Sequence, residues 1–294
     1  MIIERVNVTI RPLLPDDISA AAAAGHTALE ELYPEDLTPE EEASRIASAT
    51  VRVAHLQRTD PGGCWVAEID GQIAGAANSI IREGVWGLSL LAVLPDFQGR
   101  GIGTRLYAAA LAYGADEPGG IILSSSHPAA MRRYARTPGY RLLPTVGLSG
   151  AWDLRRAPAA LRCRPGDLAA DAHTIDGASR HVRGASHMRD LPTALDRPGA
   201  MLLVIEDEGF ACCRNGSLRL LAARTEAAAE DLLWGAITSG QRRGRFSYDF
   251  VTAENQWAIR VGLEAGLSIA LGSPVFVRGE VGPMAPYLPS AAYL

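Results

Sequence analysis

One stretch in the first half of the chain restricts the fold more than any other. It joins an apolar run, a turn rich in glycine and an amphipathic helix. The apolar run ends at Pro95, and Gly99, Gly101 and Gly103 follow at every second position. Glycines lack Cβ atoms, so backbone N–H groups can converge on an anion, and the dipole of the next helix attracts it further. The stretch therefore predicts a phosphate-binding turn between a strand and a helix, with Arg100 as a charged donor.

Two well-known phosphate-binding folds do not fit this turn. A P-loop needs a lysine after its glycines, and all 28 basic residues of this chain are arginines. A Rossmann turn opens a βαβ unit close to the first strand and carries a third glycine at a fixed spacing. Here several strands precede the turn and that glycine is absent.

Apolar periodicity and turn residues predict the order β-α-α-β-β-β-α-β-α-β for the first half. Thr38, Pro39 and Glu41 form a helix start with a capping box, and Asp70-Gly71 predicts a tight hairpin. A similar but fainter order follows after about Arg156, which indicates an internal duplication. Strands are expected at 6–13, 65–69, 73–81, 85–93, 121–124, 142–154, 160–164, 201–205, 209–213, 218–222, 246–251 and 269–278, and helices after 16, at 38–57, 102–115, 128–136, 169–183, 227–238 and 255–266.

Length and composition support a two-domain globular protein. The 294 residues suggest two domains, which we place at 1–156 and 157–294. The net charge of −5 argues against a nucleic-acid partner, and no apolar run is long enough for a membrane helix. The first residues lack the apolar core of a signal peptide. The four cysteines fit neither disulfide nor zinc spacing, so we expect reduced thiols, no metal site and a cytoplasmic protein; they are Cys64, Cys163, Cys212 and Cys213.

The turn resembles the acetyl-CoA loop of the GNAT family of N-acetyltransferases. Gln98, Gly101 and Gly103 fill the three defining positions of that loop. A second signature follows, in which Tyr134 precedes the pair Gly139-Tyr140. The resemblance implies an α/β fold of two GNAT-like domains, each a mixed, mostly antiparallel sheet flanked by helices. It also implies acetyl-CoA as cosubstrate and direct acetyl transfer in a ternary complex.

The resemblance also implies roles for individual residues. Tyr134 would be the general acid that protonates the leaving thiolate, unless it is only a buried aromatic residue on its helix. His127 stands where the family often has asparagine, and it would contact the cofactor or cap the helix that begins near Pro128. The backbone of the strand end would hold pantetheine, and the turn would hold the pyrophosphate. The expected cofactor-binding residues are Leu91, Ala92, Val93, Gln98, Gly99, Arg100, Gly101, Ile102, Gly103, Thr104, His127 and Arg133.

The acceptor side is less defined, because the strand before the turn lacks a carboxylate that could act as general base. His26 lies on the first helix, as a structural residue or as a group that faces the acceptor. Glu30 belongs to an acidic run that is either a solvated helix face or a mouth that attracts cationic amines. The last residues resemble those of the enhanced-intracellular-survival family of aminoglycoside acetyltransferases. The segment that ends at Leu294 is thus expected to dock, either by packing alone or with a terminal carboxylate as base.

The second half has no counterpart of the cofactor turn. Residues 224–231 contain no glycine, and Glu226, Glu230 and Asp231 stand where phosphates would bind. The sequence therefore predicts an N-acetyltransferase that acts on a small amine, antibiotic-like amines among them, with a degenerate second domain. Protein Nα- or lysine acetylation and a non-catalytic acyl-CoA sensor are the alternatives, and a homodimer stays open.

Overall fold

The computed structural model describes residues 8–33, 37–239 and 244–294, which fold into two compact units. The first unit contains the described residues up to Ile81 together with Trp86–Glu117. The second contains Arg82–Val85 together with Pro118–Leu294. The predicted α/β class, with mixed and mostly antiparallel sheets flanked by helices, is confirmed.

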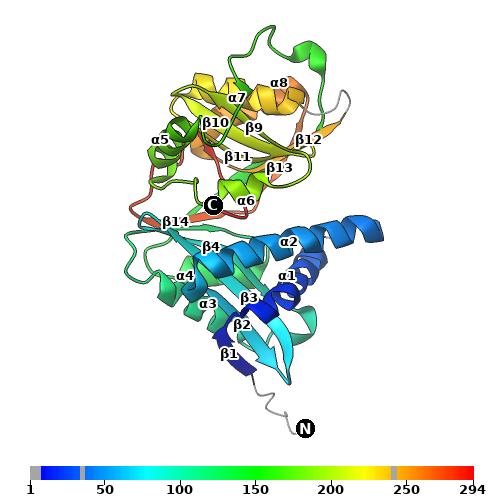
Figure 1. The fold of residues 1–294 in the computed structure, drawn as a ribbon, viewed down its shortest axis with the longest axis vertical. Helices are drawn as coiled ribbons and strands as arrows, with labels where there is room; N and C mark the ends of the chain where they lie inside the picture. The colour runs from blue at the N-terminus through cyan, green and yellow to red at the C-terminus, as the bar shows by residue number, and fades with distance from the viewer. Residues whose placement is uncertain (1–7, 34–36, 240–243) are drawn as a thin grey trace. The chain divides into compact units, whose positions relative to one another are not determined.

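The strands of the first unit follow the order β1-β2-β3-β4 (Figure 1). The hairpin between β2 and β3 has the predicted tight turn, with positive φ at Asp70 (49°) and Gly71 (80°). The capping box of α2 is also present, because the Thr38 Oγ1 accepts from Glu41 N and the Glu41 carboxylate accepts from Thr38 N. The elements are β1 Val8–Pro12, α1 Ile18–Leu32, α2 Pro39–Thr59, β2 Cys64–Ile69, β3 Gln72–Arg82, β4 Val85–Val93 and α3 Ile102–Tyr113.

Helices α1 and α3 pack on the strands of this unit. Gly25 lets α1 approach β4 closely, since a Cβ atom there would lie 3.1 Å from Leu90 Cδ2. The Ala110 carbonyl of α3 accepts hydrogen bonds from the buried Trp86 indole at 3.1 Å and from the Ser79 hydroxyl at 3.2 Å. These contacts fix both helices to the strand that leads into the glycine-rich turn.

The second unit contains two groups of strands. One has the order β5-β14-β6, and the other has the order β13-β7-β12-β11-β10-β9-β8. Most of these strand pairs are antiparallel, whereas β11 and β12 pair in parallel. The elements are β5 Gly119–Leu123, α4 Pro128–Arg136, β6 Arg141–Leu143, β7 Thr145–Ala151, β8 Arg164–Pro165, α5 Ala172–Arg183, α6 Leu191–Leu195, β9 Ala200–Ile205, β10 Gly209–Arg214, β11 Ser217–Ala223, α7 Glu226–Ser239, β12 Arg245–Thr252, α8 Gln256–Ala265, β13 Ser268–Leu271, β14 Val275–Gly279 and β15 Tyr287–Leu288.

The prediction of one continuous strand over 269–278 is wrong. The strand is interrupted at Gly272, where a Cβ atom would lie 2.4 Å from Thr145 Oγ1, and Pro274 follows. Strand β13 pairs with β7, whereas β14 pairs with β5 and β6. Strand pairing therefore crosses residue 156 in both directions, and the domain boundary at that residue stays a prediction. The expected strand at 160–164 is also wrong, because only Arg164 and Pro165 pair there.

The core of the large sheet lies under α7. Buried apolar residues of α7 pack with alternate residues of β9, β10 and β11, and α5 also packs on β10 and β11 (Figure 1). All four cysteines are free, as predicted, and burial raises the pKa of the Cys64 thiol to about 12. Among the described helices, none is both long and apolar enough to cross a membrane.

Candidate functional site

The glycine-rich turn links β4 to α3 as the sequence predicts. After Pro95–Phe97, a single 3-10 turn, the chain passes through Gly99 (φ 75°) and Gly101 (φ 79°). Both φ values lie in the left-handed region that side chains disfavour. A Cβ atom at either position would meet no atom within 4 Å. The turn thus requires glycine for its backbone conformation and leaves open space in front of it.

The N-terminus of α3 has the features of an anion site. Gly101 is its N-cap and offers no side-chain hydrogen bond to the first turn. The N–H groups of a first helical turn lack partners within the helix, and the helix dipole makes this end positive. Ile102 anchors the turn, since its side chain is buried, while Gly103 is half-buried and Thr104 is exposed. Backbone donors at an uncapped helix end suit a pyrophosphate.

Two side chains of the turn fold back onto their neighbours. Gln98 Nε2 donates to the Val93 carbonyl at 3.1 Å and lies 3.4 Å from a carboxylate oxygen of Glu31 on α1. Arg100 donates to the Asp96 carbonyl at 3.0 Å, and its guanidinium lies 5.6 Å from the centroid of the Phe97 ring. Gln98 therefore connects the end of β4 with α1, and the Arg100 guanidinium lies beside the turn against Asp96 and Phe97.

The end of β4 presents backbone in an alternating pattern. Leu91 and Val93 are half-buried and Ala92 is buried, so the side chain between them points into the core. Gly75 on β3 allows close approach there, because a Cβ atom would lie 2.6 Å from the Ala92 carbonyl oxygen.

Helix α4 carries three of the predicted residues. Tyr134 is buried (4% exposed), and its ring meets Phe276 of β14 edge-on at a centroid distance of 5.6 Å. His127 occupies the N-cap position, but its side chain makes no capping hydrogen bond. Its main-chain carbonyl accepts from Met131 at 3.1 Å. Arg133 is half-buried, one residue before Tyr134. The roles of all three in the reaction stay predictions.

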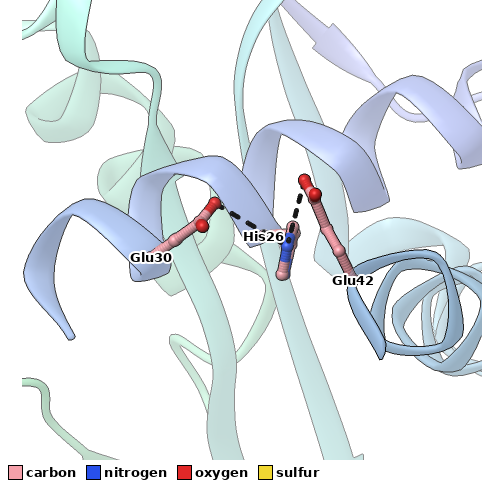
Figure 2. A group of neighbouring side chains, drawn as sticks. All are labelled: His26, Glu30 and Glu42. Atoms are coloured by element: carbon pink, nitrogen blue, oxygen red, sulfur yellow. Dashed lines mark ion pairs between the residues drawn. The ribbon is translucent and has the colours of Figure 1, made fainter. Parts of the chain in front are cut away.

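The acceptor-side residues form a small polar group on α1 and α2. His26 Nε2 lies 3.9 Å from a carboxylate oxygen of Glu30 and 3.9 Å from one of Glu42 (Figure 2). The His26 side chain is 10% exposed, whereas Glu30 and Glu42 are 42% and 48% exposed. Within the described residues, the buried Nε2 atom makes no hydrogen bond. The group therefore offers one unused nitrogen between two carboxylates.

Glu83, the carboxylate that precedes β4, is already engaged within the second unit. It forms two hydrogen bonds with the Arg180 guanidinium, at 2.7 and 2.9 Å, and accepts from Ser186 N at 2.9 Å. The Arg180 guanidinium is the main cause that holds the pKa of Glu83 below its usual value. Glu83 therefore forms a structural ion pair with Arg180.

The segment that ends at Leu294 docks within the second unit, as predicted. Leu294 is 2% exposed, and its main-chain oxygen accepts from the buried Arg183 guanidinium at 2.6 Å. The same Arg183 nitrogen donates to the Tyr293 carbonyl at 2.9 Å. A role for Leu294 as a base stays a prediction.

The acids of residues 224–231 are paired with arginines. Glu226 and Glu230 on α7 lie 3.3 and 2.9 Å from Arg260 of α8. Asp231 lies 2.6 Å from Arg162, which also contacts Glu208. These ion pairs connect α7 to its neighbours. The first turn of α7 carries Glu226, whereas the matching turn of the first half carries glycines.

The predicted residues thus fall into two sets, one in each unit. The cofactor turn, His26 and Glu30 lie in the first unit, whereas His127, Arg133, Tyr134 and Leu294 lie in the second. Glu42 belongs to the same acidic run as Glu30 in the sequence, but the sequence did not predict its pairing with His26. Its one local signal is its position in the first turn of α2, after the capping box, and no spacing rule connects it to α1.

Comparisons with known proteins agree with this geometry. A family model described as the acetyltransferase (GNAT) family matches residues 26–140. A search of curated proteins finds no match. A structure of a candidate acetyltransferase from Pyrococcus horikoshii is 18% identical, has a TM-score of 0.75, and the match covers 98% of this chain and 96% of that one.

Two further structures share the fold. A GCN5-related N-acetyltransferase from Sphaerobacter thermophilus is 17% identical with a TM-score of 0.57, over 97% of this chain and 98% of that one. Another from Kribbella flavida is 16% identical with a TM-score of 0.58, and the match covers 95% of this chain and 73% of that one. At these identities the likeness concerns the fold.

Proposed function

We propose that the protein transfers the acetyl group of acetyl-CoA directly to the amine of a small molecule, because a model of the acetyltransferase (GNAT) family matches residues 26–140. The observation that carries the proposal is the uncapped start of α3, reached through two left-handed glycines with open space in front of them. Within the turn Gln98–Thr104, the backbone donors of Gly99–Gly103 hold the pyrophosphate, because Gln98 N and Thr104 N already donate to the Pro95 and Gly101 carbonyls. The backbone of Leu91–Val93 holds the pantetheine arm. His127 and Arg133 assist from α4.

The reaction makes one carbon–nitrogen bond, breaks one carbon–sulfur bond and moves protons at the nitrogen and at the sulfur. The amine nitrogen attacks the thioester carbonyl carbon of acetyl-CoA, and a backbone N–H polarises that carbonyl. The carbon–sulfur bond then breaks, and Tyr134 donates its phenolic proton to the leaving thiolate. The acetylated nitrogen loses a proton to water or to His26, and water returns a proton to the Tyr134 phenolate. A cationic acceptor loses one further proton to water before it attacks, because an ammonium has no lone pair. The products are CoA and an amide.

The acceptor is a cationic amine, which the group of His26, Glu30 and Glu42 attracts. An ammonium donates three hydrogen bonds, and the carboxylates of Glu30 and Glu42, which are 42% and 48% exposed, can accept them beside His26. The Gln98 contact with Glu31 supports this placement, because it joins α1 to the cofactor turn. Polyamines and aminoglycosides are the class that fits. The free cysteines support the cytoplasm as the compartment.

An amine panel tests the function. The full chain is mixed with acetyl-CoA and with polyamines, aminoglycosides or peptides, and free CoA thiol is measured. We expect rapid thiol release with the small cationic amines. Faster release with peptides would replace the proposal by protein acetylation, and CoA binding without any release above hydrolysis would make the protein a sensor.

Two variants with matched controls locate the sites. Gly101→Glu should abolish release, because it adds strain and negative charge at the phosphate site. Gly71→Glu carries the same strain at φ 80° in the β2–β3 hairpin, outside the glycine-rich turn, and should retain release. Glu30→Gln should raise KM for a cationic amine by roughly two- to fivefold, as expected for one exposed charge pair. Glu40→Gln, on the exposed start of α2, should leave KM unchanged.

A further inference from the structure

Strand β11 of the large sheet has one edge that its neighbouring strands use only in part. Its first edge pairs with β10 from Ser217 to Ala223. Its second edge meets the parallel strand β12 at one position, where Ser217 lies opposite Ser247. The far edge of β12 pairs with β7. Beyond Ser217 the backbone of β11 therefore faces a gap toward β12, where buried N–H and C=O groups need partners.

The segment 284–294 enters this gap. Its strand β15 pairs antiparallel with β11, with Leu288 opposite Leu221 and Tyr287 opposite Ala222. The Pro286 carbonyl accepts from Ala223 N at 3.2 Å. Because β10 occupies the first edge of β11, β15 lies on the edge that faces β12. The segment thus completes the hydrogen bonding that the two diverging strands leave open.

The Asn255 side chain forms hydrogen bonds with the backbone of the segment. Its Oδ1 accepts from Tyr287 N at 3.0 Å, and its Nδ2 donates to the Met284 carbonyl at 3.0 Å. Its other two bonds, to Trp257 Nε1 and Thr252 Oγ1 at 3.0 Å each, orient the amide. A buried amide with all four hydrogen-bonding positions filled holds one backbone in one register.

The side chains of the segment fill closed sites. Tyr287 and Leu288 are each 1% exposed, and Leu288 belongs to the core cluster that includes Leu221 and Phe246. The Tyr287 hydroxyl lies 2.8 Å from Nε2 of the buried His187. Backbone pairing combined with pockets for alternate side chains is how proteins bind an extended peptide at a sheet edge.

We propose that the gap between β11 and β12 is a binding site for an extended peptide with an aromatic-aliphatic pair, and that residues 284–294 are its resident ligand. The site lies in the large sheet, apart from the cofactor turn of the first unit, and so goes beyond the proposed acetyl transfer.

Peptide binding in trans tests the proposal. The double variant Tyr287→Ser/Leu288→Ser removes the two buried side chains and so should release the segment from the intact gap. A fluorescent synthetic peptide with the sequence of residues 284–294 should bind this variant at least tenfold more tightly than it binds the unchanged chain. Adding Asn255→Ala should weaken peptide binding at least tenfold, whereas adding Gln256→Ala, whose amide contacts only its own turn at Ala253, should not.

Two results would overturn the proposal: equal peptide binding by the unchanged chain and the released variant, or no effect of Asn255→Ala on peptide binding. If the released variant loses its circular-dichroism signal, hydrogen exchange of the otherwise unchanged chain decides. Asn255→Ala should then speed amide exchange of residues 221–223 and of Tyr287 and Leu288 together by tenfold or more, with β9 unaffected, and unchanged rates would refute the site. No measurement here uses acetyl transfer, so its failure is separate from that of the proposed function.

Discussion

Tyr134 is the residue on which the proposed chemistry depends most. Its ring packs edge-on against Phe276, a contact that the phenyl ring of Tyr134→Phe preserves. We therefore expect the variant to keep its fold and its CoA affinity but to lose roughly 100-fold in kcat, as for loss of a general acid. Tyr248→Phe removes another buried hydroxyl, which donates to Ala258, and should leave kcat unchanged. Steady-state kinetics that show full activity for Tyr134→Phe would mean that this residue only packs.

His187 makes stability depend on pH. Burial first, then the charges of Arg183 and Arg82, lower the pKa of His187 well below its usual value. The folded chain thus holds a neutral imidazole, whereas the unfolded chain binds a proton below about pH 6.5. Unfolding then takes up a proton, so stability from this residue is complete above pH 6.5 and falls as the pH drops, by up to about 1.4 kcal/mol per pH unit. Urea titrations of the unchanged chain and His187→Gln should diverge between pH 6.5 and 5; parallel curves would contradict this.

At the scale of elements, local signals predicted well and distant pairings did not. The turn before α3, the Asp70-Gly71 hairpin and the capping box at Thr38 depend on residues within a few positions, and the structure has all three. The division of 269–278 into β13 and β14 depends on strands more than 100 residues away. Asn255 is similar: its helix was predicted, but its hydrogen bonds to Met284 and Tyr287 depend on a segment that the periodicity does not connect to it.

The whole molecule should bind one acetyl-CoA. The second half has no glycine-rich turn at 224–231, and it places Glu226 at the start of α7. The edge of β11 that faces β12 is already paired with β15. Calorimetric titration with acetyl-CoA should therefore give a stoichiometry near one. Gly101→Glu should remove that binding, and Glu226→Gln should leave it intact. A stoichiometry near two would show that the second half also holds the cofactor.

The exchange of strands across residue 156 affects how the chain must be synthesised. Strands β5 and β6 leave the ribosome early, but β14, which lies between them, is translated after every helix of the second half. Until then the two strands have no common partner, and their open edges can pair with other chains. The first half therefore cannot finish folding during its own translation, so a nascent chain that stalls before Val275 would be a target for chaperones and proteases.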